Sequence, residues 1–330
     1  MGYRLDGLMS GFCLLGAVCQ AGGMNKPSIR QATADDTHVL ALLLNGTQEP
    51  HFHTTAAQLA ASIQREPERY LVAERNGHLM AGISLGFPEF HPQHVWLGCS
   101  LHPDHRTPEL AQTPLAQAAP AARAKGRQLA WTSVRADCLS AQPDLNALGF
   151  REVHRTFGGG FFLDAPPAGI EALETRLQQQ DISIQPALTL RDDPRLKELY
   201  SAVRGEKVTA EPTILAANEA LHDPDSLWEA AFVAIRSGQV PGSSGEVLGL
   251  ALPERSRLDA WNAVLLVCPE VRRRSIGTAL QARVCATLHT QGFGFLNTAG
   301  VDTDAAYLGV LRRLSANIEP DGIAFEAALP

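Results

Sequence analysis

The stretch "VCPEVRRRSIGTAL", residues 267–280, sets three consecutive arginines between an apolar run and a turn of small residues. The apolar run, residues 261–267 ("WNAVLLV"), has the length and composition of a buried strand. After Pro269 an apolar residue recurs at every fourth position, which predicts a helix. These residues are Ile276, Leu280, Val284 and Leu288, and Gly292 follows where a helix C-cap belongs. The sequence therefore predicts a strand, a loop and a helix in that order.

The predicted loop has the composition of an anion-binding turn. The small side chains of Ser275, Gly277 and Thr278 let backbone N–H groups approach a ligand at the start of the helix, where the dipole favours negative charge. Arginines directly before such a turn can hold phosphate oxygens in bidentate fashion. The loop is therefore a candidate diphosphate site, and the alternative is that the arginines form only a solvated face.

Composition limits the classes of function. A chain of 330 residues predicts two domains, and a net charge of −7 with a pI near 5.9 argues against bulk nucleic-acid binding. The six cysteines contain no C-x-x-C pair, so we predict neither a zinc site nor a disulfide framework, and we expect a cytoplasmic protein. No apolar run after the N-terminal region is long enough to span a bilayer.

Residues 1–23 leave two alternatives open. Arg4 and the apolar residues 8–18 resemble a secretory or lipid signal, but no small-x-small cleavage site follows. Met24 opens "MNKPSIRQATADD", which has the character of a domain start. We therefore expect residues 1–27 to be an extension that arises from an upstream mis-start or a disordered tail, with an export signal as the alternative.

The chain contains an internal repeat with an offset of 166 residues. "LHPDHR" (101–106) matches "VCPEVR" (267–272), and the same offset relates Gly126 to Gly292 and Leu148 to Leu314. Residues 165–182 contain two prolines and a short helical pattern, which predicts a linker. The domains expected on this basis are 28–164 and 183–330.

On these residues the sequence resembles the GNAT superfamily of N-acetyltransferases. Their acetyl-CoA loop has the pattern Arg/Gln-x-x-Gly-x-Gly/Ala, which here falls on residues 272–277 with Ser275 at the first glycine. "LNALGFREV" (145–153) and the linker are also similar to tandem GNAT proteins. The resemblance implies an α/β fold of two GNAT-like domains, each a mixed, mostly antiparallel sheet flanked by helices.

The resemblance also implies that acetyl-CoA is the co-substrate and that the C-terminal copy holds it. The residues expected to bind it are Leu266, Val267, Arg272, Arg273, Arg274, Ser275, Ile276, Gly277 and Thr278. In the N-terminal copy the matching loop, residues 106–111, carries Pro108 and Glu109, and Pro120 falls within the following helix. A carboxylate there repels phosphate and each proline removes an N–H donor, so we expect this copy to have lost cofactor binding.

Catalytic residues are harder to identify from the sequence. The tyrosine that many GNAT enzymes use as a general acid is replaced by Leu311, so Tyr307, one helical turn upstream, is the candidate acid, with an ordinary packed aromatic as the alternative. The family's "LGF" has become Leu-Ser-Ala at residues 314–316, which puts the terminal hairpin in doubt. Asp259 and Glu254 are candidate bases, with exposed loop acids as the alternative. Three histidine pairs, at residues 51–53, 91–94 and 102–105, have the character of polar loop residues, and we predict no metal site from them.

The sequence thus predicts acetyl transfer from acetyl-CoA to a small amine, directly within a ternary complex. Neither nucleic acid nor a membrane is expected as a partner, and the oligomeric state is not indicated. The alternative is a non-catalytic CoA-binding or interaction protein built from two decayed GNAT domains.

Overall fold

The computed structural model describes residues 27–46, 53–88, 91–105, 108–141, 145–204, 217–237, 245–256, 259–301, 304–319 and 321–330. These residues form two units, each with its own sheet and core. The N-terminal unit comprises the described residues up to 156 together with 321–330, and the C-terminal unit comprises those from 157 to 319.

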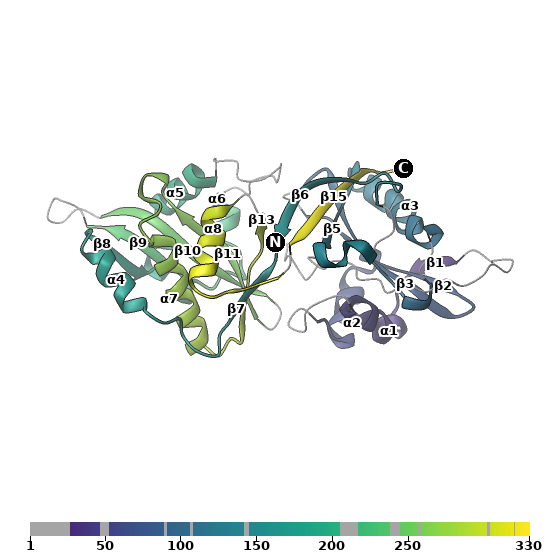
Figure 1. The fold of residues 1–330 in the computed structure, drawn as a ribbon, viewed down its shortest axis with the longest axis horizontal. Helices are drawn as coiled ribbons and strands as arrows, with labels where there is room; N and C mark the ends of the chain where they lie inside the picture. Colours follow the sequence, from purple (N-terminus) through teal and green to yellow (C-terminus); the bar gives the residue numbers. More distant parts are fainter. Residues whose placement is uncertain are drawn as a thin grey trace. The chain divides into compact units, whose positions relative to one another are not determined.

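The N-terminal unit is a mixed sheet with helices on both faces (Figure 1). Its sheet follows the order β1-β2-β3-β4-β5-β15-β6-β13, in which β4 and β5 are parallel and the other pairs from β1 to β6 are antiparallel. Apolar residues of α1 and α2 pack on one face, and those of α3 on the other. The elements are β1 (Ser28–Gln31), α1 (Thr37–Asn45), α2 (Ala56–Arg65), β2 (Tyr70–Arg75), β3 (His78–Gly86), β4 (His94–Leu101), α3 (Pro108–Ala124), β5 (Leu129–Arg135), β6 (Arg151–Phe157) and β15 (Gly322–Ala328).

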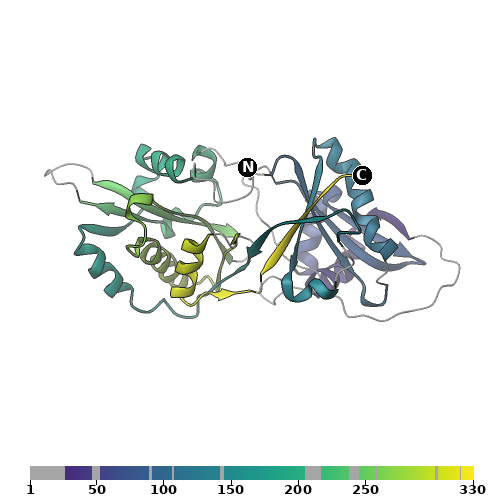
Figure 2. The ribbon, with the colours of Figure 1, turned by 45° about the horizontal axis from the view of Figure 1, so that its top comes forward.

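The C-terminal unit repeats this plan, with helices on both faces of its sheet (Figure 2). The strand order is β14-β7-β12-β11-β10-β9-β8, and only β11 and β12 are parallel. Helices α4, α7 and α8 share one core, whereas α5 and α6 share the other. The elements are β7 (Gly159–Phe162), α4 (Ile170–Gln178), β8 (Ile182–Pro186), α5 (Pro194–Arg204), α6 (Ala217–Leu221), β9 (Phe232–Arg236), β10 (Glu246–Ser256), β11 (Asp259–Val267), α7 (Ile276–Thr290), β12 (Phe295–Asn297), β13 (Gly300–Val301), α8 (Ala305–Arg313) and β14 (Asn317–Ile318).

The two copies exchange their last strands. β7 follows β6 in sequence but pairs with β12 and β14 in the C-terminal sheet. β15, at the end of the chain, pairs with β5 and β6 in the N-terminal sheet. The units therefore differ from the expected ranges 28–164 and 183–330 by one strand each, and the linker region 165–182 contains α4, whose Leu177 is fully buried.

The exchange explains the glycines of "GGGFF" (158–162). Gly159 begins a strand that pairs with β12 and β14 and not with β6. A Cβ atom on Gly159 would lie 2.0 Å from the Asn317 carbonyl oxygen, and one on Gly160 would lie 2.3 Å from that of Leu296. Only glycine lets β7 fit between its two neighbours.

The repeat offset holds at the left-handed turns. Gly126 and Gly292 end α3 and α7 with φ values of 74° and 83°. Gly149 has a φ of 85°, and its counterpart Ser315, the altered residue of "LGF", keeps the turn with a φ of 58°. Pro120 lies within α3 as expected, and a short 3-10 helix, Ala136–Ala141, follows β5.

Two further findings concern the chain's environment. Among the described residues, no helix is long and apolar enough to cross a membrane. Cys99, Cys268 and Cys285 are free thiols. Cys138 is disulfide-bonded, which was not expected from the sequence.

We predict that deleting residues 320–330 unfolds the N-terminal unit. β15 supplies hydrogen bonds to both β5 and β6, and Ile323, Phe325 and Ala327 belong to the unit's core. Calorimetry should show one unfolding transition lost, and a synthetic peptide of residues 321–330 should restore it by strand addition. A truncated chain that unfolds like the intact chain would contradict the exchange.

Candidate functional site

The candidate site lies where β11 and β12 stop pairing with each other. The two parallel strands pair only through Ala260 with Leu296 and Trp261 with Asn297. β12 then ends, whereas β11 continues to Val267. Along this stretch the described residues provide no strand on that side of β11. Apart from the Val267 carbonyl, which accepts a hydrogen bond from Arg272 Nε at 3.2 Å, its backbone N–H and C=O groups facing away from β10 are therefore available to a ligand.

A bulge in β11 accompanies this separation. Leu252 pairs with Val264 and Glu254 with Trp261, so Pro253 of β10 faces two residues of β11, Asn262 and Ala263. The extra residue shifts the alternation of side chains. Ala260 and, beyond the bulge, Leu265 and Val267 all pack in the core of α7, whereas Ala263, Val264 and Leu266 pack in the core of α5.

The loop after β11 has a conformation suited to anions. Arg273 and Ser275 have φ values of 64° and 68°, and Ser275 is the N-cap of α7 without a side-chain capping bond. The Ala279 N–H donates to the Ser275 carbonyl at 3.0 Å, the bond that starts the helix. The N–H groups of Ile276, Gly277 and Thr278 precede it and have no acceptor within the described chain. Three donors are thus directed out of the positive end of the helix dipole.

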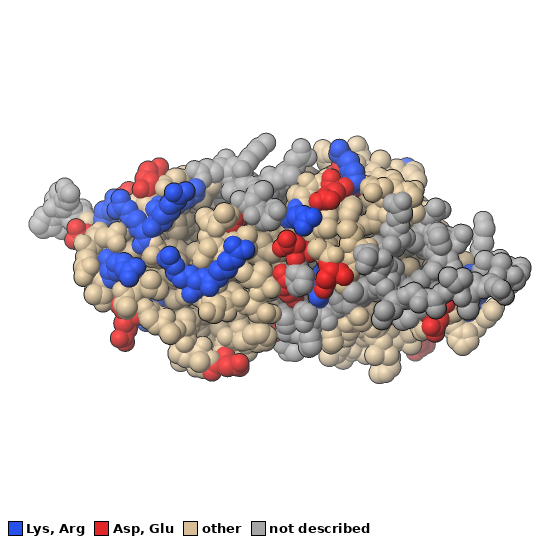
Figure 3. All heavy atoms as spheres, viewed as in Figure 1, with Lys and Arg blue, Asp and Glu red and all other residues tan. Residues whose placement is uncertain are grey.

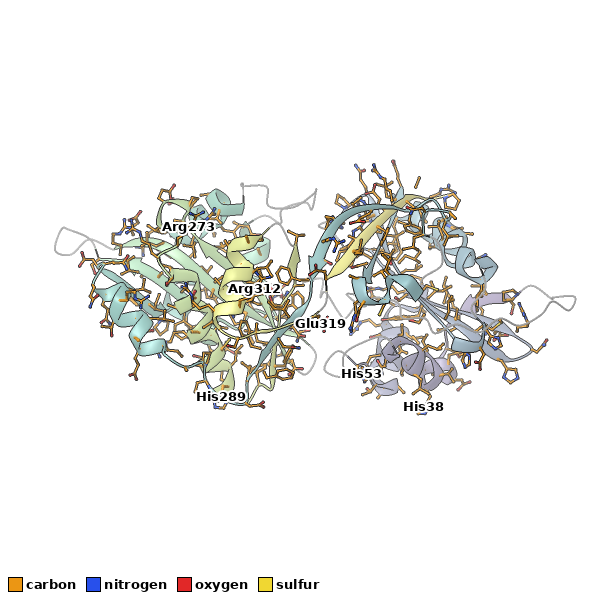
Figure 4. All side chains as sticks on the ribbon, viewed as in Figure 1. His38, His53, Arg273, His289, Arg312 and Glu319 are labelled. Atoms are coloured by element: carbon orange, nitrogen blue, oxygen red, sulfur yellow. The ribbon has the colours of Figure 1, made fainter. Side chains whose placement is uncertain are left out.

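Five exposed arginines surround this loop, and we call them the arginine patch: Arg272, Arg273, Arg274, Arg312 and Arg313. Figure 3 shows blue spheres over the loop and α8, and Figure 4 labels Arg273 in the loop and Arg312 on α8. Arg313 donates from Nη1 to Ser275 Oγ at 3.0 Å, which ties α8 to the loop. Arg273, Arg274 and Arg312 have no ion pair with any described residue. These three arginines therefore offer positive charge without a described acidic partner beside the free N–H groups.

The residues predicted to bind the cofactor divide into two groups. The three loop arginines, Ser275 and Gly277 lie together at the surface, as expected for a ligand site. The side chains of Leu266, Ile276 and Thr278 are buried in the core, so these residues can offer only their backbone groups. Val267 is partly buried and lies 3.5 Å from where a Cβ atom on Gly277 would be.

Tyr307 lies at the other end of the free edge, within a polar network. Its hydroxyl accepts a hydrogen bond from Asn262 Nδ2 at 2.6 Å and bonds to Thr298 Oγ1, directly after β12. Asn262 Nδ2 also donates to Gln281 Oε1 of α7 at 2.8 Å. Burial raises the pKa of Tyr307 to about 12, so its hydroxyl keeps its proton at neutral pH. The residue is therefore able to donate a proton or a hydrogen bond where β11 and β12 separate.

Sequence reasoning identified Tyr307 but missed Asn262, Gln281 and Thr298. Gln281 is fully buried, and Asn262 and Thr298 are 9% and 1% exposed. An asparagine inside the apolar run "WNAVLLV" and a glutamine on the apolar face of the predicted helix were the available signals. Buried polar side chains of this kind require partners, and their positions could have been questioned on that ground.

Glu254 differs from an exposed loop acid. It is half-buried near the end of β10, where Ser226 forms an isolated bridge with it. Burial and the charges of Asp223 and Asp225 raise its pKa to about 7. A carboxyl group with this pKa can exchange protons near neutral pH. Asp259, the other candidate, is the first residue of β11.

The N-terminal copy shares the short strand pairing, since β4 pairs with β5 only from His94 to Trp96 and continues to Leu101, but its described residues lack the bulge. β3 and β4 pair in unbroken register from Ala81 with Leu101 to Gly86 with Trp96, without a bulge. The residues of β4 that pack in the core of α3 are all apolar: Val95, Leu97, Cys99 and Leu101. Arg106 and Thr107 of the altered loop lie outside the described residues, and Pro108 begins α3.

The histidines have structural partners. His94 Nε2 lies 2.8 Å from Glu326 Oε2 of β15, and Trp96 Nε1 donates to His91 Nδ1 at 3.0 Å. Burial lowers the pKa of His91 to about 4, which keeps it neutral. His51 lies outside the described residues, and the described ones contain no group of His, Cys, Asp and Glu side chains placed to hold a metal ion.

Comparison with known proteins gives a family for one copy and a fold for the whole chain. Residues 37–150 match the family model described as Acetyltransferase (GNAT) family. No curated protein matches the chain in sequence. The chain is similar to the GCN5-related N-acetyltransferase from Sphaerobacter thermophilus, with 16% identity and a TM-score of 0.70 over 92% of this chain and 96% of that one.

Two further structures extend the similarity. A tandem GNAT protein from the clavulanic acid biosynthesis pathway matches with 17% identity and a TM-score of 0.57 over 92% of this chain and 99% of that one. A fungal GCN5-related glucosamine N-acetyltransferase region matches with 14% identity and a TM-score of 0.63, over 93% of this chain and 39% of the multi-domain protein that contains it. At these identities the similarity establishes the fold, and it confirms the predicted pair of GNAT-like domains.

We predict that Ser275→Gly stabilises the protein. A left-handed φ costs a non-glycine residue about 1 kcal/mol that glycine avoids, and the bond lost to Arg313 is exposed. Ser275→Ala, which loses the hydroxyl but keeps the strained φ, is the matched control. In urea unfolding, the Ser275→Gly variant should be more stable than wild type, and wild type should be at least as stable as Ser275→Ala. A glycine variant less stable than the alanine variant would contradict the backbone strain at this position.

We predict that Glu254→Gln stabilises the protein only at high pH. A carboxyl whose folded pKa is about 7 instead of 4.5 binds its proton more tightly in the folded chain. Wild-type stability therefore falls as pH rises from about 4.5 to about 7. The glutamine variant avoids this loss, so its free energy of unfolding should equal wild type at pH 4 and exceed it at pH 8 by at most about 3 kcal/mol.

The control for this variant is Glu246→Gln. Glu246 is an exposed acid on the same strand, paired with Arg236. Its replacement should produce no such gain at high pH. A gain for Glu254→Gln that is the same at pH 4 and pH 8 would contradict the raised pKa.

Proposed function

This chain has the tandem GNAT fold with a GNAT-family acetyltransferase domain at residues 37–150, and we propose that it is an acetyl-CoA-dependent N-acetyltransferase whose C-terminal copy holds acetyl-CoA. The acceptor is a small amine, and transfer is direct within a ternary complex. The observation that carries the proposal is the uncapped start of α7, with its free N–H groups, beside the arginine patch and the free edge of β11.

The loop and the arginine patch fit the diphosphate of coenzyme A. The N–H groups of Ile276, Gly277 and Thr278 lie at the positive end of the α7 dipole. Arg273 and Arg274 have no described acid to compete with a phosphate. The backbone groups of Leu265 and the Val267 N–H lie on the free edge of β11, where amide groups of a pantetheine arm can bond to them. Acetyl-CoA would supply an activated acetyl group with a thiolate as the leaving group.

The proton transfers can be assigned to residues of the C-terminal copy. The neutral amine forms a C–N bond with the acetyl carbon, the C–S bond breaks, and sulfur keeps the electron pair. Glu254, with a pKa of about 7, accepts the proton that nitrogen loses, directly or through water. Tyr307 keeps its proton at neutral pH and donates it to sulfur. One proton leaves nitrogen and one reaches sulfur, so the reaction balances once both residues exchange protons with water.

The acidic residues near Glu254 favour an amine that is cationic in solution. The charges of Asp223 and Asp225 act on Glu254, and the same negative field attracts an ammonium group. The bound ammonium first loses one proton to water to form the neutral nucleophile, and Glu254 accepts the second proton as the C–N bond forms. The N-terminal copy binds no acetyl-CoA in this proposal and acts as a structural lid or acceptor platform.

The test is calorimetry with acetyl-CoA, followed by release of free thiol with a panel of primary amines. Replacing both Arg272 and Arg274 with alanine should weaken acetyl-CoA binding by about 10- to 100-fold, because each charge-assisted phosphate bond contributes roughly 1 kcal/mol or more. Arg106→Ala in the N-terminal loop is the matched control and should leave binding unchanged.

The outcomes separate the two candidate functions. Binding with thiol release supports the enzyme. Binding without thiol release from any amine supports the non-catalytic CoA-binding protein. Loss of binding in Arg106→Ala, with Arg272 and Arg274 dispensable, would move the cofactor to the N-terminal copy.

A further inference from the structure

Asn262 has a buried oxygen without a partner. The side chain is 9% exposed. Its Nδ2 uses both hydrogens, toward Tyr307 at 2.6 Å and Gln281 at 2.8 Å. Its Oδ1 has no hydrogen-bond partner in the described protein. Leaving a buried acceptor unpaired costs about 1–3 kcal/mol, so this atom requires an explanation.

The network fixes which atom of the Asn262 amide remains unpaired. Gln281 Nε2 donates to Cys285 Sγ at 3.8 Å, which turns the Gln281 carbonyl toward Asn262. Asn262 must then present its NH₂ group to Gln281, and its oxygen is left over. The missing partner is therefore a hydrogen-bond donor.

The position of Asn262 links this atom to the reaction. It is the first residue of β11 beyond the last pair with β12, and it lies in the bulge. Five residues of strand, about 17 Å, separate it from Val267 at the loop. A ligand bound with its diphosphate at the loop and its arm along the free edge would bring its reacting end to Asn262.

We propose that Asn262 Oδ1 accepts a hydrogen bond from the N–H of the acceptor amine, an inference that rests on the proposed function. A thioester carries a carbonyl oxygen and a sulfur but no hydrogen-bond donor, so the reacting end of acetyl-CoA cannot satisfy this oxygen. A primary amine has N–H groups to spare. One N–H held by Asn262 limits the directions in which the nitrogen lone pair can point.

The bond also strengthens as the reaction proceeds. Nitrogen becomes positive when it forms the C–N bond, and a charged N–H donor makes a stronger hydrogen bond than a neutral one. An interaction that strengthens toward the transition state contributes to the rate as well as to binding. In the N-terminal copy the residues of β4 that pack against α3 are apolar, so no equivalent acceptor exists in that part of the described chain.

The test measures binding of n-butylamine to protein saturated with CoA, which needs no catalysis. Calorimetry should show that Asn262→Leu weakens n-butylamine by about 10- to 100-fold, as expected for a bond to a charged donor. CoA affinity should stay within about twofold, since CoA binding does not use this oxygen. Cys285→Ala, which changes the far end of the same network, is the control and should keep the affinity for n-butylamine.

A second measurement uses wild-type protein, in case the leucine variant fails to fold. Butyltrimethylammonium has the charge of butylammonium but no N–H, and it should bind at least about tenfold more weakly. Equal binding of the two cations, or equal binding of n-butylamine by wild type and Asn262→Leu, would overturn the inference. If the discrimination is present but acetyl transfer is absent, only the proposed function fails.

Discussion

The short pairing of β11 with β12 is the constraint on which the site depends. Two residue pairs join the strands, and beyond them the edge of β11 has no described partner up to Val267. A sheet that continued this ladder would use the same N–H and C=O groups internally and leave none for a ligand. The bulge at Asn262 and Ala263 occurs at the same place and turns Asn262 toward α7. The separation of the strands therefore frees the backbone edge of β11, and the bulge places the polar side chain of Asn262 at the end of that edge farthest from the loop.

The exchange of β7 and β15 gives the N-terminal copy a role that does not depend on any ligand. β7 is encoded with the N-terminal copy, yet it lies between β12 and β14 in the sheet of the C-terminal unit. Removing the N-terminal copy would take this strand away and expose the edge of β12, next to β11. A copy with an altered loop is thus required to complete the sheet that carries the site, and the copies cannot be separated without damage to both.

Local patterns in the sequence were sufficient to predict the strands and helices, but not which strands pair with one another. The strand, loop and helix around Arg272 follow from apolar spacing, and the residue offset of 166 correctly relates Gly126 to Gly292. The sheet that β7 joins could not be predicted, because its residues form the same strand pattern in either sheet. The bulge depends on Pro253 in the neighbouring strand, which no spacing within β11 reveals.

The polar network was missed for a similar reason. Asn262 bonds to Gln281, 19 residues away, and to Tyr307, 45 residues away. Each residue alone fits the pattern of its own element, and only their contact makes them a group. Ser275 and Ser315 stand where the resembled GNAT pattern has glycine, and both have left-handed φ values, a conformation that glycine adopts without strain.

The serine at position 275 also connects the two ends of the site. Its hydroxyl accepts the bond from Arg313 at the end of α8, while Tyr307 lies near the start of the same helix. α8 has nine residues and is about 13 Å long, so it links the anion-binding loop to the polar network as one rigid element. A glycine would relieve the strain at position 275 but remove this bond. Serine at position 275 therefore has a strained backbone conformation, but its hydroxyl holds the loop at a fixed distance from Tyr307.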